Sequence, residues 1–500
     1  MVTRFTIERD GNERINLNFC KKSCFFVMLL LLTLWLFLLI WLKKEFGAVS
    51  LDQLMFFAQM PILESNPEVI KTFVVKVLLR SIGITSAICI VLIYFWRKKS
   101  FFRNSCCFLA GGYFLILAVS WFHLQVSDYL GRSSIGEVGT FYEENYVFPE
   151  TVIINEPEEK QNLILIYIES MEVTYSDVNI FGEDYIAPLT QLSKDNLMFG
   201  RFEQMNYVEH TIAGIVGTQA GIPLMSNSSI ISNGNKYSHI PVFLPKAYSL
   251  GQILEKQGYK NFYFSGSSIR FAGTDTFFRS HGFSENTWGK DELYKSEFLN
   301  EKEKGIFQKK EKNWGIYDAD LYQIFRVKIK NYAEQGKPFF AIMSTIDTHG
   351  PEGVKGPNVI AGKTGHPFGD ILYCSTEEAV SFVEWVQAQP FGEKTTIVII
   401  GDHLAMENPL SEKLQKGERK IYHTFINSRK SVPNVNRQFS HFDLFPTMLE
   451  SIGFEVEGHR LGLGTSLFSE EKTLIEKLGK EQFNQELGKR SELYLDLMLP

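Results

Sequence analysis

Long apolar stretches dominate the beginning of the chain, whereas the rest alternates short apolar runs with longer mixed segments. The first stretch, residues 25–42, is unbroken and long enough to cross the hydrocarbon core of a bilayer. Two further stretches, residues 77–96 and 105–122, have the same character, and Arg80 lies near one end, where its side chain can extend to the interface. No small-residue cleavage site follows the first stretch, which argues against a removable signal peptide. The pattern predicts a membrane domain over residues 25–122 with three transmembrane helices.

Flanking charges predict how these helices are oriented. A lysine pair at residues 21–22 lies near the end of a polar cytoplasmic lead over residues 1–24, and four basic residues crowd the link at 97–103. Because Lys and Arg concentrate on the cytoplasmic side, both clusters are expected inside and the chain after the third stretch outside. The lysine pair at residues 43–44 points the other way. We therefore expect a multi-pass protein of the bacterial cytoplasmic (inner) membrane whose larger part lies on the periplasmic or extracellular side.

The pattern changes after a polar linker at residues 123–160. Short apolar runs rich in β-branched residues then alternate with helix-compatible segments. The runs are residues 162–168, 261–264, 339–344 and 395–400. Runs this apolar are typical of strands buried on both faces, and the segments between them suit parallel crossovers. We predict an α/β domain over residues 161–468, with a mainly parallel sheet between helices, and a helical C-terminal tail over residues 469–500.

Carboxylates and histidines follow three of the predicted strands. Glu169 follows the first, Asp347 and His349 follow the third, and Asp402 and His403 follow the last. Ligands of open α/β sheets bind beyond the carboxyl ends of the strands, so these side chains are expected to converge. The oxygen and nitrogen donors of Glu169, Asp402 and His403 suit Mn²⁺ or Zn²⁺ better than Ca²⁺. No cysteine lies beside them, which excludes a structural zinc cluster.

Each of these interpretations has a structural alternative. The Asp-His pair after the last strand is also explained by a turn with a helix cap. His349 would hydrogen-bond a phosphate oxygen or protonate a leaving group, or belong to a loop-stabilising turn with Asp347. His281 and His441 are predicted to be packed, structural histidines.

Residues 205–223 present Thr211 at the start of a helix-compatible run. The small residues behind it are Gly214, Gly217, Ala220 and Gly221. They allow another group to approach the backbone closely. By itself the segment favours a capping threonine on a packed helix. Beside a metal, Thr211 instead fills an open coordination position as a nucleophilic alkoxide, at a helix start that favours a phosphate.

Composition narrows the class of protein. The formal net charge of −6 does not indicate a nucleic-acid partner. Of six cysteines, only Cys374 lies beyond the apolar stretches and their flanks, so no intramolecular disulfide is expected in the outer part. That part must be stabilised by its hydrophobic core.

Several motifs resemble the alkaline phosphatase and sulfatase superfamily. They are Tyr167-Ile-Glu-Ser170, Glu209-His-Thr-Ile-Ala-Gly214 and Gly401-Asp-His403. More narrowly, the chain resembles the membrane-anchored phosphoglycerol transferases, which include the lipoteichoic acid synthases and the phosphoglycerol transferase I branch that decorates osmoregulated periplasmic glucans. The narrower resemblance rests on Gln219-Ala-Gly-Ile-Pro-Leu224, Arg270-Phe-Ala-Gly-Thr-Asp275, Ser280-His-Gly-Phe283, Trp314-Gly-Ile-Tyr-Asp318, Asp347-Thr-His349, Asp402-His-Leu-Ala-Met406 and Arg460-Leu-Gly-Leu-Gly464.

The resemblance implies that Glu169, Thr211, Asp402 and His403 hold one divalent metal, most often Mn²⁺ in the synthases, with Zn²⁺ or Mg²⁺ as alternatives. It implies that Thr211 is the nucleophile and that His349 contacts phosphate. The implied reaction transfers the glycerophosphoryl head group of phosphatidylglycerol to Thr211, releasing diacylglycerol, and then to a glycan acceptor.

Other substrate contacts are less closely matched. In the lipoteichoic acid synthases an arginine in an aromatic-rich loop holds the glycerophosphate, and residues 271–275 lack it here. Arg270 is the candidate substitute, and Asp347 and Trp314 are further candidates for contacts with substrate. An aromatic residue beside a helix cap is the structural alternative for Trp314.

Neighbouring activities define the alternatives. The acceptor can be a periplasmic glucan, another envelope sugar, or a growing glycerophosphate polymer, as in a lipoteichoic acid synthase. Phosphoethanolamine transferases also use a threonine, but their outer domains are commonly rich in disulfides. A sulfatase would need a Cys/Ser-X-Pro-X-Arg motif, which Thr211 does not open. A non-catalytic membrane scaffold would have no use for all four predicted ligands together.

Overall fold

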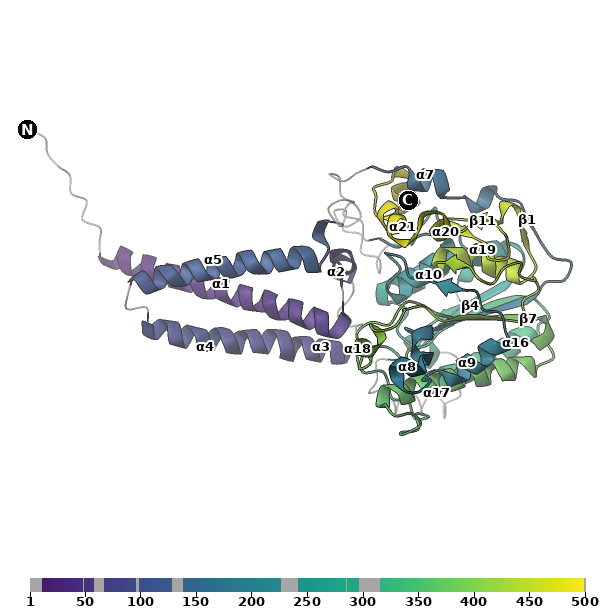
Figure 1. Cartoon of the computed structure of the whole chain (residues 1–500), viewed down its shortest axis with the longest axis horizontal. Helices are drawn as coiled ribbons and strands as arrows, with labels where there is room; N and C mark the ends of the chain where they lie inside the picture. Colours follow the sequence, from purple (N-terminus) through teal and green to yellow (C-terminus); the bar gives the residue numbers. More distant parts are fainter. Residues whose placement is uncertain are drawn as a thin grey trace, which may run out of the picture. The chain divides into compact units, whose positions relative to one another are not determined.

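The computed structural model of the protein describes residues 11–47, 49–57, 67–95, 99–127, 138–225, 242–284, 286–295 and 315–498. It divides into two compact units (Figure 1). One comprises Met1–Leu51 with Asn66–Ser127, and the other comprises Asp52–Ser65 with Asp128–Pro500.

The first unit is helical. Its elements are α1 (Gly11–Phe46), α3 (Pro67–Phe73), the π-helical segment η2 (Val74–Leu79), α4 (Arg80–Phe95) and α5 (Lys99–His123). Among the residues described, three segments are long and apolar enough to cross a membrane: Lys21–Phe46, Val69–Phe95 and Phe101–His123. They correspond to the three apolar stretches of the sequence, and they give the protein a membrane anchor. The short helix α2 (Leu51–Phe57) follows α1.

The second of these segments begins eight residues earlier than the sequence pattern predicted, at residue 69 rather than 77. The early part carries Lys71 and Lys76, which interrupt the hydropathy pattern. Lys76 Nζ lies 2.5 Å from Glu45 Oε1, and the Glu45 side chain is buried. Pairing with a carboxylate of α1 therefore lets the helix extend through a lysine.

Polar contacts between helices hold the first unit together. Thr33 Oγ1 lies 2.8 Å from Thr85 Oγ1, and the Trp35 indole donates a hydrogen bond to Ser120 Oγ at 2.8 Å. Hydroxyl contacts of this kind are typical of helix pairs in membranes, where burial in lipid gives helices little hydrophobic reason to associate.

The second unit is built on a six-stranded sheet with the order β5-β4-β6-β2-β7-β8. Its strands are β5 (Thr287–Trp288), β4 (Lys260–Ser265), β6 (Phe339–Ser344), β2 (Asn162–Ile168), β7 (Thr395–Gly401) and β8 (His423–Ile426). All neighbouring pairs are parallel except β7 and β8. The four predicted strands are the four central ones, which confirms the predicted mainly parallel α/β fold.

Helices cover both faces of this sheet (Figure 1). Alternate residues of β2 enter opposite cores: Leu163, Leu165 and Tyr167 one, and Ile164, Ile166 and Ile168 the other. The first core contains side chains of α10 (Thr211–Ala220), α12 (Leu250–Lys256) and α19 (His441–Ser451). The second contains side chains of α9 (Ala187–Lys194), α16 (Asp318–Ala333) and α17 (Pro367–Gln387). Strands apolar on both faces are what this two-sided burial requires.

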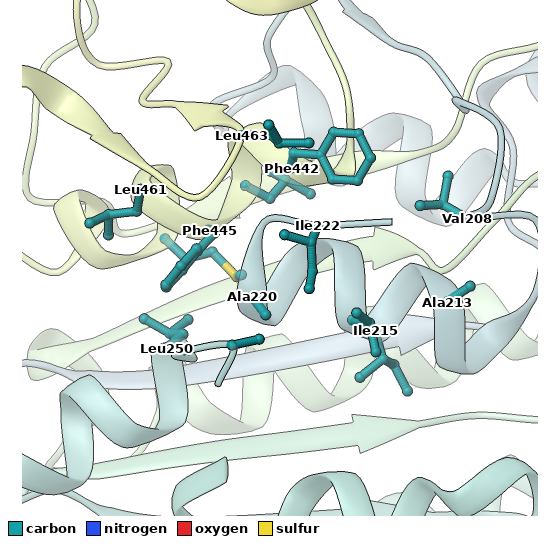
Figure 2. Packing of buried hydrophobic residues seen from close by; sticks show 14 of the residues in the cluster. Val208, Ala213, Ile215, Ala220, Ile222, Leu250, Phe442, Phe445, Leu461 and Leu463 are labelled. Atoms are coloured by element: carbon teal, nitrogen blue, oxygen red, sulfur yellow. The ribbon is translucent and has the colours of Figure 1, made fainter. Parts of the chain in front are cut away.

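Helices α10 and α19 share one apolar cluster. Figure 2 shows Ile215 and Ala220 of α10, and Ile222 just beyond it, in the same cluster as Phe442 and Phe445 of α19. Full burial of each such aliphatic or aromatic side chain contributes about 1.5–3 kcal/mol, so this cluster fixes α10 firmly against α19.

The C-terminal segment is helical but is not one continuous helix. It forms α20 (Leu474–Leu478), α21 (Lys480–Leu487) and α22 (Glu492–Met498). Gly479, with a φ of 77°, separates the first two. Leu474, Phe483 and Leu497 enter the first core, so the segment packs into the unit rather than covering it loosely.

Candidate metal and nucleophile site

The predicted ligands converge at the carboxyl edge of the sheet. Glu169 directly follows β2 and Asp402 directly follows β7, and these strands are neighbours with Ile168 opposite Gly401. Ligand atoms of Glu169, Asp402 and His403 lie within 4.8 Å of one another, and all three residues are buried. In the part of the chain that the structure describes, this is the one group of acidic, histidine or cysteine residues so arranged.

Distances within the group leave room for an ion. His403 Nε2 lies 3.5 Å from Glu169 Oε1 and 3.4 Å from Asp402 Oδ2. Thr211, the first residue of α10, donates from Oγ1 to Glu169 Oε2 at 3.3 Å. The hydroxyl, the two carboxylates and the imidazole therefore surround one space, and the positive end of α10 lies beside it.

Hydrogen bonds orient the donor atoms toward that space. His403 Nδ1 lies 2.8 Å from the Leu404 carbonyl, which can only accept, so Nδ1 carries the hydrogen and Nε2 presents its lone pair. Asp402 Oδ1 accepts from the N–H groups of Ser170 and His403 at 2.8 and 2.9 Å. Asp402 Oδ2 is buried and has no hydrogen-bond partner among the residues described.

A strained turn supports this arrangement. Ser170 has a φ of 55°, which few non-glycine residues adopt. In this conformation its hydroxyl also donates to Glu169 Oε1 at 2.7 Å. Backbone strain persists where the surroundings enforce it, often at functional sites.

The donor set fits a divalent cation. An unpartnered buried carboxylate oxygen carries a free-energy penalty, which a cation between Asp402, Glu169 and His403 would remove. Mixed carboxylate and imidazole ligands suit Mn²⁺ and Zn²⁺. Glu169, Asp402 and His403, with the Thr211 hydroxyl, are the residues that would hold the ion.

The pKa shifts of these residues also indicate an excess of negative charge at the site. Burial raises the pKa of Asp402 to about 7, and the neighbouring Glu169 carboxylate adds to the effect. Burial opposes ionisation of Glu169 too, but His349 and His403 outweigh it and lower the pKa of Glu169. Burial likewise disfavours the charged form of His403, yet Asp402 and Glu169 raise its pKa overall. The titrations of these three groups are therefore coupled, and a cation among them would offset the charge of the two carboxylates.

This charge predicts how stabilisation by metal depends on pH. The pKa of Asp402 in the folded protein, about 7, lies above its ordinary 3.8, so without metal its contribution to stability is lost as pH rises through about 7. A cation binds the deprotonated carboxylate and restores that contribution. Added Mn²⁺ should therefore stabilise the protein more at pH 8 than at pH 6, by on the order of 1 kcal/mol. Thermal unfolding with and without Mn²⁺ at both pH values measures this, and an equal shift at both would contradict it.

The loop after β6 packs against Glu169 and brings His349 to the site. The Glu169 N–H donates to Thr345 Oγ1 at 3.1 Å, and Thr348 Oγ1 donates to the Glu169 carbonyl at 2.5 Å. His349 is half-buried, and its Nδ1 lies 2.6 Å from the Gly350 carbonyl. This assigns the hydrogen to Nδ1 and leaves Nε2 as the nitrogen that would face substrate.

Asp347 and Asp318 are both buried. Asp347 is buried, its Oδ1 has no hydrogen-bond partner in the described ranges, and burial beside Asp318 raises its pKa well above the ordinary value. Asp318 Oδ1 accepts from the N–H groups of Ile346 and Asp347 at 2.8 and 3.1 Å. Asp318 therefore shapes the loop that carries His349, a role that the sequence motif did not reveal.

The other two predicted substrate contacts are Arg270 and Trp314. The Arg270 guanidinium is half-exposed and pairs with Asp291 Oδ2 at 2.9 Å. Trp314 lies outside the described residues.

Buried polar contacts hold the loop after β7. Gln204 Oε1 accepts from the Leu404 N–H at 2.6 Å, and Glu172 Oε1 accepts from the Ala405 N–H at 2.8 Å. Arg419 pairs with Glu172 and donates to the Ala405 carbonyl at 2.7 Å. Glu172 is buried and Arg419 is partly buried, and together they connect this loop to the segment that carries Arg419.

Helices of membrane-spanning length, a mainly parallel sheet and a buried acid–histidine group together define a membrane-anchored α/β protein with a candidate metal centre. The family model described as Sulfatase matches residues 161–454, more than half of the chain, and the chain belongs to this family.

The chain is also similar to curated relatives. "Phosphoglycerol transferase I" of Escherichia coli O6:K15:H31 (strain 536 / UPEC) is 32% identical over 320 residues, which cover 63% of this chain and 40% of that protein. The chain thus spans 40% of the length of the relative it matches.

The chain is also similar, at lower identity, to solved structures. A protein in the alkaline phosphatase superfamily from Vibrio parahaemolyticus is 19% identical, with 70% of this chain and 80% of that chain covered and a TM-score of 0.48. The lipoteichoic acid synthase LtaP from Listeria monocytogenes is 16% identical, with 64% and 79% covered and a TM-score of 0.48.

Proposed function

We propose that this protein transfers the glycerophosphoryl head group of phosphatidylglycerol, through a covalent intermediate on Thr211, to an envelope glycan such as a periplasmic glucan. The observation that carries the proposal is the placement of the Thr211 hydroxyl, 3.3 Å from Glu169, against the buried group formed with Asp402 and His403. The name of the curated relative, phosphoglycerol transferase I, supports the same head group.

The first half-reaction joins the head group to the protein. Thr211 Oγ1 forms a bond to phosphorus, the bond from phosphorus to the diacylglycerol oxygen breaks, and diacylglycerol leaves. Glu169 Oε2, which accepts the Thr211 hydrogen bond, is the nearest acceptor for the departing proton. In its doubly protonated form, His349 would donate from Nε2 to a phosphate oxygen or protonate the leaving oxygen. A divalent ion at this site, Mn²⁺ in this proposal, would lower the pKa of the hydroxyl and offset phosphate charge.

The second half-reaction transfers the glycerophosphoryl group from Thr211 to the acceptor. A hydroxyl of the acceptor attacks phosphorus and gives its proton to a base, for which His349 Nε2 is the candidate. The bond to Thr211 Oγ1 breaks, and the threonine recovers its proton from Glu169. Burial of Glu169, Asp402 and His403 keeps competing water away from their donor atoms.

Purified full-length protein in detergent tests the proposal. With Mn²⁺ and phosphatidylglycerol labelled in the acyl chains, we expect labelled diacylglycerol, and little from phosphatidylethanolamine. Release from phosphatidylethanolamine alone would move the protein to the phosphoethanolamine class. Release from neither lipid, by protein that still binds Mn²⁺, would contradict the proposal.

The proposed location has its own test. With both basic clusters inside, the catalytic unit should lie on the periplasmic or extracellular side of the cytoplasmic membrane. A phosphatase reporter that works only outside the cytoplasm, fused after Pro500, should be active in cells. A fusion after residue 98, between the second and third apolar stretches, is the matched control and should be inactive. The opposite result would reverse the assigned orientation.

A further inference from the structure

Three elements meet at the backbone carbonyl of Asp402: the end of β7, helix α10 and helix α19. His441, the first residue of α19, lies with Nε2 2.7 Å from the Asp402 oxygen and is completely buried. Because a carbonyl only accepts, Nε2 carries the hydrogen and donates it. His441 is buried, in keeping with the prediction of a packed, structural histidine, and its ring also reaches the backbone of a predicted metal ligand.

The carbonyl belongs to the peptide that joins two predicted ligands. That peptide links Asp402 to His403, and its N–H donates to Asp402 Oδ1 at 2.9 Å. His441 holds the oxygen at the other side of the same plane. Fixing both ends of one planar peptide fixes the directions in which the two ligand side chains leave it.

Helix α10 reaches the same carbonyl one turn beyond Thr211. A Cβ on Gly214 would lie 2.2 Å from the Asp402 oxygen, far inside any permitted contact. A Cβ on Gly217 would lie 2.9 Å from His441 Cβ. These glycines are therefore required by close approach, and they set the helix that carries the proposed nucleophile against the ligand loop.

The hydrogen bond from Nε2 explains why a histidine occupies this buried position. His441 Nδ1 is buried and has no hydrogen-bond partner within the described chain. Burial lowers the pKa of His441 to about 3, so the ring is neutral. An apolar side chain would fill this space without the free-energy cost of an unpartnered nitrogen. The imidazole is thus explained by the bond from Nε2.

We infer that His441 is a positioning residue: its Nε2–H orients the Asp402–His403 peptide, and with Gly214 it sets the distance between Thr211 and the metal ligands. Only the kinetic part of this inference rests on the proposed function. The metal-binding part stands on the site geometry alone.

Three variants test the role, each measured for Mn²⁺ affinity by calorimetry and for kcat and KM with phosphatidylglycerol. His441→Leu, which removes the hydrogen bond, should weaken Mn²⁺ binding about 10–100-fold, as loss of a group that orients a ligand typically does. It should lower kcat and leave the KM for lipid within about twofold, because the lipid contacts are untouched. His441→Gln, whose amide can donate from nearly the same place, should recover most of both.

Gly214→Ala keeps His441 but pushes the Asp402 carbonyl away, so it should weaken Mn²⁺ binding similarly. The matched control is His281→Leu. His281 is also fully buried and contacts main-chain carbonyls, those of Phe277 and Ala247 at 2.7 and 3.1 Å. It should lower the unfolding temperature without changing Mn²⁺ affinity.

Wild-type Mn²⁺ affinity in folded His441→Leu would overturn the inference, as would a His441→Gln variant that is as impaired as His441→Leu. Should His441→Leu fail to fold, folded Gly214→Ala decides by the same measurement: weakened binding supports the role, and wild-type binding overturns it. Absence of lipid turnover by the wild type would count against the proposed function and leave the Mn²⁺ comparison intact.

Discussion

Replacing Thr211 by alanine is expected to lower diacylglycerol release from phosphatidylglycerol by about 10⁴-fold or more, the scale seen when a covalent enzyme loses its nucleophile. The hydroxyl is the one group of α10 that approaches the carboxylate of Glu169, at 3.3 Å in the described structure. The other hydroxyl of that helix, on Thr218, is fully buried and bonded to the Gly214 and Ile215 carbonyls, so the variant has no replacement nucleophile on α10.

Metal binding separates this effect from a loss of the site. Glu169, Asp402 and His403 are unchanged in Thr211→Ala, so Mn²⁺ should still raise its unfolding temperature. Thr211→Ser keeps a hydroxyl and should keep measurable activity. Thr151→Ala, which removes an exposed threonine hydroxyl bonded to the Phe148 carbonyl, is the matched control and should behave as wild type. Near-normal release by Thr211→Ala would show that another group attacks the lipid.

Replacing Asp402 by asparagine should abolish stabilisation by Mn²⁺ while leaving the metal-free protein equally or more stable at pH 8. Burial raises the pKa of Asp402 to about 7, so at pH 8 a second buried carboxylate charge opposes Glu169. Asparagine removes this charge and keeps an oxygen for the N–H groups of Ser170 and His403. Removing a buried charge that lacks a partner removes its desolvation cost, so the metal-free variant should be no less stable than wild type.

Paired thermal unfolding curves measure both halves of this result. Wild type should gain stability on addition of Mn²⁺, whereas Asp402→Asn should not, and its activity should fall with its metal affinity. Asp195→Asn changes an exposed carboxylate and should match wild type in both conditions. Retained Mn²⁺ stabilisation in Asp402→Asn would place the ion elsewhere.

The central sheet could be predicted because its strands are apolar on both faces. The predicted strands at residues 162–168 and 339–344 coincide with β2 and β6. Strands buried between two helical layers have apolar side chains on both faces, so their sequences are nearly continuous apolar runs. The edge strands β5 and β8 were not predicted. β5 has two residues and β8 has four, too few to establish a pattern.

The metal group could be anticipated because its members follow strands that end at one edge. Glu169, Asp402 and His403 are placed by sheet topology, which the apolar runs reveal. His441 acts through a main-chain carbonyl 39 positions away, and such a contact leaves no trace in residue spacing. The glycines of α10 were the available signal: Gly214 indicated that something approaches the helix, and the structure identifies it as the Asp402 backbone.

Within the candidate site, the contacts with substrate are the hardest to predict from the sequence. Arg270 was proposed from a motif alone, and in the structure it pairs with Asp291 on α14 (Lys290–Lys295) at the surface. Loop side chains are positioned by neighbours distant in sequence, so adjacency to a motif does not establish where they point.

Detecting the covalent intermediate on Thr211 tests the proposed mechanism most directly. Full-length protein with Mn²⁺ would be mixed with phosphatidylglycerol labelled in the head-group glycerol, quenched in acid during turnover, digested and mapped by mass spectrometry. We expect a labelled glycerophosphoryl group on the peptide that contains Thr211. With the label in the acyl chains instead, we expect no label on the protein. Steady release of diacylglycerol with Thr211 unmodified, or with the label on another residue, would contradict the proposed mechanism.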